Sequence, residues 1–301
     1  MKYVFTADWH IRGDKPSCRK SNFLDIQKKT IEQIFAISND NNAVLVHAGD
    51  IFHSSKIKDS EYWLSFLFDR ISYYNISFAF IAGNHDLPEH SVKAVDNSSF
   101  GAFKNALHLH YGYSMIEALN NFASLDYPCN FNTLSNNAML NSFLVLHCYC
   151  AEKAPGFIKD GISASGLLDE LSFKVFVTGD NHHGFVFEKD GRFVINPGCI
   201  TRQAVDMKDY KPFVVLFDDL TFSYEKIYLC DNDVDDFDLF EYNQTQERKD
   251  RLDSSFVTKL KSTINIDYSF EDNLKKECVL SKASDSVENI IKLALKGGIE
   301  E

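Results

Sequence analysis

The chain has 301 residues, 45% hydrophobic and 14% aromatic, which is enough for one large core and a smaller appended segment. It contains no run of about 18 apolar residues, so we expect no membrane helix, and its seven scattered cysteines show no disulfide framework, which favours a reducing, cytoplasmic location. The net charge is −12, of which residues 231–301, with 17 acidic and 10 basic side chains, contribute −7; a protein that grips DNA unaided usually has a basic surface.

Short apolar runs that end in polar residues predict a series of strands, and helical periodicity alternates with them, so we expect an α/β protein. The expected strands cover 3–7, 43–48, 78–82, 142–146, 174–178, 193–196, 213–217 and 221–229. Apolar residues at helical spacing predict helices at about 20–38 and 60–74, the second between Ser60 and Asn75. Residues 1–230 are therefore expected to form the main domain.

From residue 231 the composition changes. The stretch 231–242 is rich in aspartate and indicates an acidic linker, and helices are expected at about 243–264 and 285–296. Residues 243–301 would form a small C-terminal segment, helical or α+β, that caps the main domain or binds a partner. The apolar stripe of the last helix fits either packing onto its own domain or docking to another protein.

Side chains of the types that bind metals follow five of the predicted strands. In chain order they are Asp8 and His10, Asp50, Asn84 and His85, His147, and Asp180 and His182. Because sites in open α/β folds form at the carboxyl ends of strands, we expect these side chains to converge. Imidazole, carboxylate and amide ligands together suit manganese, iron or zinc better than magnesium, and a pair of such ions can catalyse phosphoester hydrolysis.

This ordered series resembles the calcineurin-like metallophosphoesterase superfamily. The motifs are Asp8-x-His10, Gly49-Asp50, Gly83-Asn84-His85-Asp86, His147 and Gly179-x-x-His182. Within the superfamily the chain is similar to SbcD-type nucleases, the nuclease subunits of double-strand-break-repair complexes, through Gly49-Asp50-Ile51-Phe52-His53, Leu144-Val145-Leu146-His147 and Asn196-Pro197-Gly198-Cys199. The resemblance covers about residues 1–230, and the compact size is similar to phage-type members.

The resemblance implies a four-layer α/β/β/α sandwich and a role for each motif residue. Asp8, His10 and His182 would hold one metal ion, Asn84 and His147 the other, with Asp50 bridging them. His85 would act as general acid or steady the transition state, Asp86 would orient His85, and His53 would help to place the phosphate. Two divalent ions are implied, with Mn²⁺ as the first choice and Mg²⁺, Fe²⁺ and Zn²⁺ as alternatives.

One position departs from the family pattern. The family usually has Gly-His-x-His where this chain has Gly179-Asp180-Asn181-His182. A carboxylate can still bind the same ion, so Asp180 is kept as a ligand of the metal that Asn84 would hold, and a shifted arrangement using His182 and His183 is the alternative. Arg202, after the Pro197-Gly198 turn, is a candidate for binding a substrate phosphate.

The resulting hypothesis is a metal-dependent DNA nuclease, exonuclease or endonuclease, acting in DNA recombination or repair. It would work with an SbcC-type ATPase that supplies the grip on DNA, would form a homodimer through about 92–120, and would lie in the cytoplasm, or in the host cytoplasm if phage-encoded. The alternative is a stand-alone phosphatase or cyclic-nucleotide phosphodiesterase. A third hypothesis, from a different class, is a non-catalytic scaffold subunit with a decayed site.

Overall fold

The computed structural model describes residues 1–20, 22–111, 119, 121–134, 142–153, 161–233, 237–238 and 242–243. The chain divides into two compact units, Met1–Glu241 and Tyr242–Glu301, and nearly all described residues belong to the first. The helices expected at 243–264 and 285–296 lie outside the described residues. Within the described part, no helix combines the length and the apolar character needed to cross a bilayer.

Two five-stranded sheets form the centre of the first unit. The first has the order β12 (Ser223–Tyr228), β11 (Phe213–Asp218), β1 (Lys2–Thr6), β2 (Ala43–His47) and β3 (Phe78–Phe80). The second has the order β4 (Phe122–Leu125), β5 (Phe143–His147), β8 (Val175–Gly179), β10 (Arg192–Asn196) and β9 (Phe185–Lys189). In the first sheet β1, β2 and β3 pair in parallel, and β11 pairs antiparallel with both β1 and β12. In the second sheet β4, β5, β8 and β10 pair in parallel, and β9 pairs antiparallel with β10.

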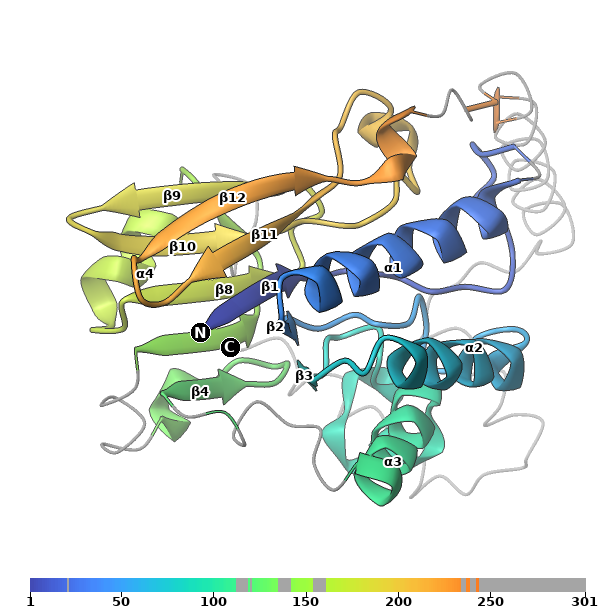
Figure 1. Ribbon diagram of the computed structural model, residues 1–301, viewed down its shortest axis with the longest axis horizontal. Coiled ribbons are helices and arrows are strands. Elements are labelled where there is room, and N and C mark those ends of the chain that lie inside the picture. Colours follow the sequence, from blue (N-terminus) through green and yellow to red (C-terminus); the bar gives the residue numbers. More distant parts are fainter. Residues whose placement is uncertain are drawn as a thin grey trace, which may run out of the picture. The chain divides into compact units, whose positions relative to one another are not determined.

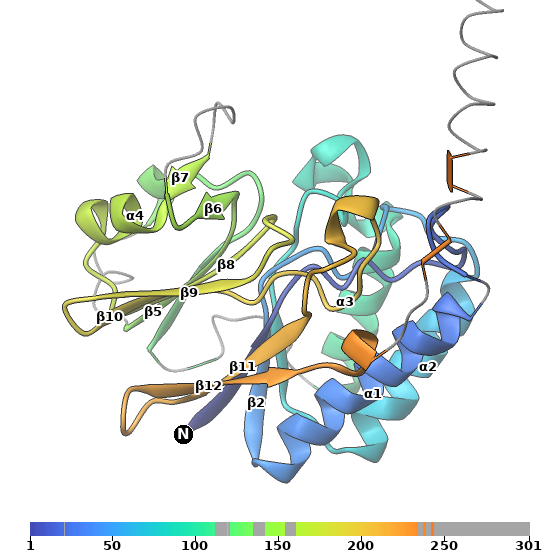
Figure 2. The ribbon, with the colours of Figure 1, turned by 90° about the horizontal axis from the view of Figure 1, so that it is seen from above.

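Helices cover the outer faces of this pair of sheets, which gives four layers. The helices are α1 (Phe23–Asp40), α2 (Ser60–Tyr73), α3 (Ser99–Tyr111) and α4 (Ala164–Glu170). One apolar cluster joins the two sheets, a second packs α1, α2 and α3 on the first sheet, and a third packs α4 on the second. Figures 1 and 2 show α4 on one side of the sandwich and α1 and α2 on the other. The expected α/β/β/α sandwich is confirmed.

All eight strands expected from the sequence overlap observed strands, within a few residues at their ends. The helices expected at 20–38 and 60–74 correspond to α1 and α2. The sequence prediction did not include β4, β9, α3, α4 or the short pair β6 (Cys150–Ala151) and β7 (Ile162–Ser163). Ser163 is the N-cap of α4, and its Oγ accepts a hydrogen bond from Gly166 N–H at 3.1 Å.

The loops after β1 and β2 continue to run side by side beyond the ends of the strands. Asp8 N–H donates to Gly49 O at 3.0 Å, His10 N–H to Asp50 O at 3.1 Å and Ile11 N–H to Ile51 O at 2.9 Å. His53 N–H then donates back to Ile11 O at 3.0 Å. This extended pairing places the residues after the first strand directly beside those after the second.

A buried cluster of charged side chains lies near the C-terminal end of the first unit in the sequence. Arg19 and Asp231 are both fully buried and are joined by a 2.7 Å contact between Nη2 and Oδ1. Arg202 donates through Nε to Asp231 Oδ2 at 3.0 Å, and Phe237 lies over both guanidinium groups at 5.2 and 5.5 Å. The first residue of the stretch expected as a linker is thus part of the core of the unit.

Candidate metal centre

Most of the sequence-predicted ligands converge in the structure. Ligand atoms lie within 4.8 Å of one another in three groups of described residues: Asp8, His10 and His182; Asp8, Asp50 and His147; and His10, His53 and His85. Asn84 joins the second group, since its Oδ1 lies 2.9 Å from His147 Nε2. These side chains come from the ends of five different strands, so the fold brings together residues up to 174 positions apart.

Asp50 occupies the middle of the cluster. Its Oδ1 accepts from His85 N–H at 2.9 Å, which fixes the orientation of the carboxylate. Its Oδ2 is buried, has no hydrogen-bond partner, and lies 3.6 Å from His10 Nε2 and 3.4 Å from His147 Nε2. An unsatisfied anionic oxygen between two imidazole nitrogens is costly unless a cation binds it, which is the environment of a bridging carboxylate.

The imidazoles are held in orientations that suit metal binding. His147 Nδ1 lies 2.7 Å from Ala48 O, which can only accept, so this nitrogen carries a proton and Nε2 faces Asn84 and Asp50. His10 Nε2 and His182 Nε2 face one another at 3.0 Å, beside Asp8. When the protons of both rings are on Nδ1, these two nitrogens are placed to bind one cation.

The buried carboxylates disturb the titration of the whole cluster. Burial raises the pKa of Asp8 well above its usual value, and the neighbouring Asp50 charge adds to this. Burial alone would lower the pKa of His147, but the charge of Asp50 outweighs it and raises that pKa to about 10. The same pairing holds the pKa of Asp50 below its usual range against the effect of burial. The centre is therefore an acidic pocket whose charge is only partly balanced.

Glycines that the sequence analysis did not single out as functional make room for the ligands. A Cβ on Gly83 would lie 2.1 Å from Asp50 Oδ1, and a Cβ on Gly49, where φ is +92°, would lie 2.3 Å from His147 Nδ1. Both distances are shorter than any real contact, so a larger residue would displace the ligand. The motifs Gly-Asp and Gly-Asn-His-Asp contain these glycines, and close backbone approach is the physical reason for them.

Several of the ligand residues have left-handed backbone conformations. The φ angles are +49° at Asp8, +45° at His10, +60° at Asp50 and +74° at Asp180. Non-glycine residues in this region cost of order 1 kcal/mol or more each and gather at functional sites. Each of these residues follows closely after the end of a strand, where the left-handed conformation turns the chain.

Asp86 has a different task from the one expected. Its carboxylate accepts from the backbone N–H groups of Asp50, Phe52 and Gly83 at 2.9, 2.9 and 3.0 Å, so it ties the two loops together rather than orienting the His85 ring. Burial and the Asp50 charge raise the pKa of Asp86 to about 7. The His85 ring is instead oriented by the backbone of His53, whose carbonyl lies 2.7 Å from His85 Nδ1.

Three other sequence candidates lie outside the ligand groups. Asp180 donates its backbone N–H to Asp8, but its carboxylate, shorter than the imidazole usual at this position, is in none of the groups formed by the described residues. His183 is exposed and lies edge-on to Tyr210 with ring centroids 5.3 Å apart, whereas His182 is in the cluster. Arg202 is buried against Asp231, so its guanidinium group serves the core and is not placed to bind a substrate phosphate.

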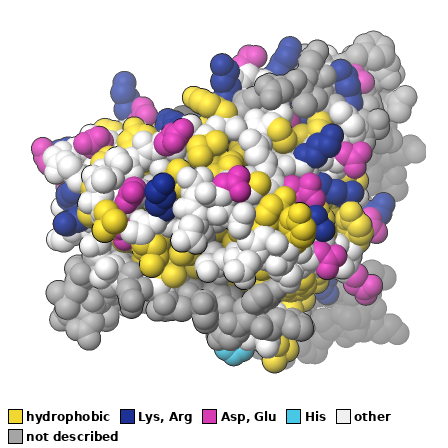
Figure 3. Space-filling view, viewed as in Figure 1, with side chains coloured by type: hydrophobic (Ala, Val, Ile, Leu, Met, Phe, Trp, Pro, Cys, Tyr) yellow, Lys and Arg dark blue, Asp and Glu magenta, His cyan; other side chains and the backbone are white. Residues whose placement is uncertain are grey.

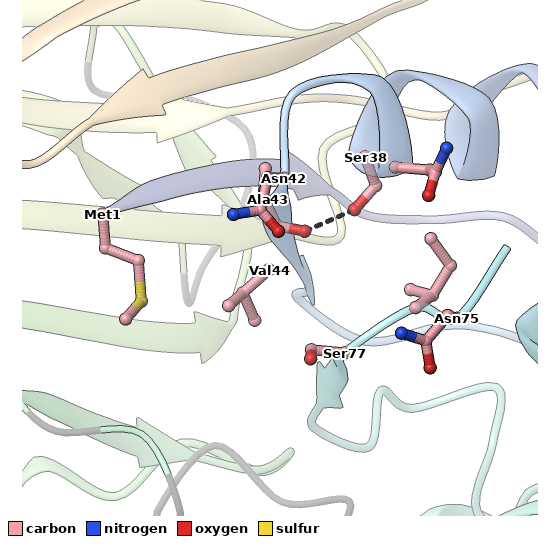
Figure 4. Close-up of a pocket in the computed structure, with 9 residues that line it drawn as sticks. Met1, Ser38, Asn42, Ala43, Val44, Asn75 and Ser77 are labelled. Atoms are coloured by element: carbon pink, nitrogen blue, oxygen red, sulfur yellow. Dashed lines mark hydrogen bonds between the residues drawn. The ribbon is translucent and has the colours of Figure 1, made fainter.

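A cavity of about 770 Å³ adjoins the cluster. His147 and Asp180 line it together with residues from the segments around Tyr127 and Tyr149. A smaller cavity of about 270 Å³ lies at the opposite, amino-terminal end of β2, where Ser38 Oγ donates to Ala43 O and Asn42, Asn75 and Ser77 surround the opening (Figure 4). The larger cavity is thus the one placed to hold part of a substrate.

A model of the calcineurin-like phosphoesterase family matches residues 1–184, which include the strand-end ligands from Asp8 to His182. The chain belongs to this family. No curated protein matches it. Similar solved structures include a novel archaeal phosphodiesterase, with 18% identity, a TM-score of 0.38, and coverage of 76% of this chain and 100% of that chain. Vps29 of Entamoeba histolytica complexed with zinc has 11% identity and a TM-score of 0.34, and the match covers 76% of this chain and 99% of that chain. Vacuolar protein sorting 29 of Cryptosporidium parvum has 13% identity and a TM-score of 0.33, and the match covers 75% of this chain and 95% of that chain.

The donor set of this phosphoesterase fits two divalent cations. Asp8, His10 and His182 form one three-sided group, while Asp50 and His147, with Asn84 beside them, form another around the unsatisfied Oδ2 of Asp50. Borderline nitrogen ligands mixed with hard oxygen ligands are suited to first-row transition metals.

We expect metal affinity to weaken about tenfold for each unit that the pH falls below the pKa of His147, about 10, because one proton must leave His147 when a cation binds. Since the pKa of His147 is raised to about 10, its Nε2 is protonated throughout this range in the metal-free protein. Calorimetric titration with Mn²⁺ at pH 6.5, 7.5 and 8.5, in buffers of different ionisation enthalpy, measures both affinity and proton release. Affinity independent of pH, with no proton released, would contradict this assignment of the His147 proton.

Proposed function

We propose that this phosphoesterase is a metal-dependent DNA nuclease that hydrolyses phosphodiester bonds at a dimetal centre. The observation that carries the hydrolytic part is the position of Asp50 Oδ2, unsatisfied and buried between His10 and His147. The nuclease part is supported by Gly49-Asp50-Ile51-Phe52-His53, which resembles SbcD-type nucleases and places a third histidine beside the cluster. The His53 and His85 rings stack with centroids 5.8 Å apart.

Some of the clustered residues would bind the cations, and others would act on the phosphate of the substrate. Bound here, two cations would supply the Lewis acidity and positive charge that phosphodiester hydrolysis needs, with Mn²⁺ as the proposed ion. Asp8, His10 and His182 would hold one, Asn84 and His147 the other, and Asp50 both. His85 would donate a proton to the leaving oxygen, because its Nδ1 is fixed on the His53 carbonyl and its other nitrogen is left for substrate.

The acidic net charge of the chain supports the proposal of a partner that supplies a basic surface. On the face shown in Figure 3, basic and acidic side chains are intermixed, and the net charge is −12. We therefore propose that an SbcC-type ATPase supplies the basic surface for DNA, in the cytoplasm. We also propose a homodimer through about 92–120, where Val92 and Leu109 are 49% and 83% exposed.

A stand-alone phosphodiesterase acting on small molecules is the second candidate. The acidic balance of the chain and the 770 Å³ cavity, which is large enough for one small organic group, favour it. The two candidates predict different substrates for the same metal centre.

One assay separates them. The purified full chain is supplied with Mn²⁺ and offered linear duplex DNA, single-stranded DNA, cyclic nucleotides and methyl p-nitrophenyl phosphate, each with and without its cognate ATPase. Cleavage of DNA supports the nuclease. Turnover of the small esters without cleavage of either DNA, even with the ATPase, rejects the nuclease in favour of the second candidate. No turnover of any substrate by metal-loaded protein would favour the scaffold hypothesis.

Replacing His85 with asparagine is expected to lower kcat for DNA by about 10²- to 10⁴-fold, the usual contribution of a positioned general acid. The loss should be much smaller for methyl p-nitrophenyl phosphate, because p-nitrophenolate departs without a proton. Steady-state rates on both substrates measure this difference, and Asp25→Asn, at a side chain 73% exposed on α1, is the control. Equal losses on both substrates would show that His85 stabilises the transition state without donating a proton.

A further inference from the structure

The cavity beside the metal centre has walls that metal binding does not require. Its volume of about 770 Å³ lies within the range of pockets for small organic ligands, roughly 300–1,000 Å³. Three aromatic side chains line it, Tyr127, Phe131 and Tyr149, together with Pro128 and Ile162. His147 and Asp180 connect this lining to the cluster, so a molecule bound through its phosphate at the metal centre can extend into the cavity.

Tyr127 is fixed at the junction between cavity and metal centre. Its N–H donates to Ala82 O at 3.2 Å, and the preceding Asp126 Oδ1 accepts from Ala82 N–H at 2.8 Å. These bonds tie Tyr127 to the residue just before the Gly83-Asn84 turn. Its ring lies 6.4 Å from the ring of the ligand His147 and 6.1 Å from that of His90. The Tyr127 ring is half-buried, so part of it is accessible from the cavity.

The charge of the lining indicates which part of a substrate fits. Its charged side chains are Glu170 and Asp180, both acidic, and the described lining contains no lysine or arginine. Carboxylates repel a second phosphate, so the phosphate backbone of a nucleic acid is disfavoured here. An uncharged planar group suits the aromatic walls, and the carboxylates can accept hydrogen bonds from exocyclic amines.

We infer that this cavity binds a nucleobase adjacent to the bond being cut, turned out of the stack, with Tyr127 and Phe131 as its aromatic platform. The inference rests on the proposed function and names the part of the substrate that the centre selects. A base enters most readily from a single strand or a frayed end, because turning one out of a duplex costs a few kcal/mol of unstacking and unpairing energy. The enzyme should therefore cut single-stranded DNA and duplex ends in preference to the interior of a duplex.

The test removes the base and the ring separately and together. Two single-stranded oligonucleotides of one length are compared, one intact and one with abasic tetrahydrofuran residues at the positions that flank the cleavage site. Wild type, Tyr127→Leu, Phe131→Leu and the control Tyr73→Leu, whose side chain on α2 is 73% exposed, are assayed with Mn²⁺. Removing the bases should lower kcat/KM of the wild type about tenfold or more, as expected for loss of base–aromatic stacking.

If ring and base touch, the two losses are not additive in free energy. On the intact strand, Tyr127→Leu or Phe131→Leu should lower kcat/KM about tenfold relative to the wild type. On the abasic strand the same substitutions should change kcat/KM little, and Tyr73→Leu should behave as the wild type on both strands. Equal wild-type rates on both strands, or losses that multiply in both cavity variants, would overturn the inference and leave the nuclease standing. Wild type that cleaves neither strand but hydrolyses methyl p-nitrophenyl phosphate would overturn the proposed function itself.

Discussion

Replacing Asp50 with asparagine is expected to lower kcat/KM for any phosphodiester by about a thousandfold or more. The amide keeps the size of the side chain and can still accept from His85 N–H, but the buried Oδ2 position between His10 and His147 loses its negative charge. A dimetal clamp contributes several kcal/mol to catalysis, and about 4 kcal/mol corresponds to three powers of ten in rate.

Metal content distinguishes this effect from misfolding. Asp50→Asn should bind fewer than the two metal ions expected of the wild type while keeping its far-ultraviolet circular dichroism. Metal analysis after dialysis, together with kinetics, makes both measurements. Asp25→Asn, at a side chain 73% exposed on α1, is the control and should change neither. Full metal occupancy in Asp50→Asn with activity within tenfold of wild type would remove Asp50 from the bridging role.

Replacing Asp231 with alanine is expected to destabilise the protein by about 3–5 kcal/mol, the usual result of breaking a buried ion pair by removing one of its members. Asp231 is fully buried, and it contacts both Arg19 and Arg202 at 2.7 and 3.0 Å. Without it, two guanidinium groups in the core lose the carboxylate that they share, and their hydrogen bonds to backbone carbonyls remain. For a unit of this size the melting temperature should fall by about 10 °C.

A surface ion pair of this protein provides the matched control. Lys189 and Asp169 are also 3.0 Å apart, but their side chains are 44% and 66% exposed, so Asp169→Ala should change stability by less than about 0.5 kcal/mol. Thermal and urea unfolding of both variants, in the presence of chelator, gives the comparison without a contribution from metal. Equal small effects would mean that the core tolerates the loss of the shared carboxylate.

The strands and most of the ligands were predictable because both depend on local sequence. A buried strand is a short apolar run, and the residues just after it reach the sheet edge whatever the rest of the chain does. That is why Asp8, Asp50, Asn84, His147 and His182 meet in the structure. The β9–β10 hairpin had a local signal that was overlooked: Asp190-Gly191, with φ of +54° and +69°, is a typical hairpin turn.

The remaining features depend on contacts between distant segments. Asp86 was given the wrong partner because its acceptor role requires the Gly83 turn and the 50–52 loop to be packed together. Arg202 finds its partner 29 residues away, in a stretch whose composition resembles a linker. The reach of Asp180 and the aromatic lining of the cavity depend on the relative placement of several loops, which periodicity does not encode.

At the left-handed turns of Asp8, His10 and Asp50, the side chain needed for metal binding raises the free energy of the backbone conformation. Glycine at any of these positions would relax the backbone and would also delete a ligand. In a lineage released from selection for hydrolysis, such replacements would be favoured by the stability of the fold itself.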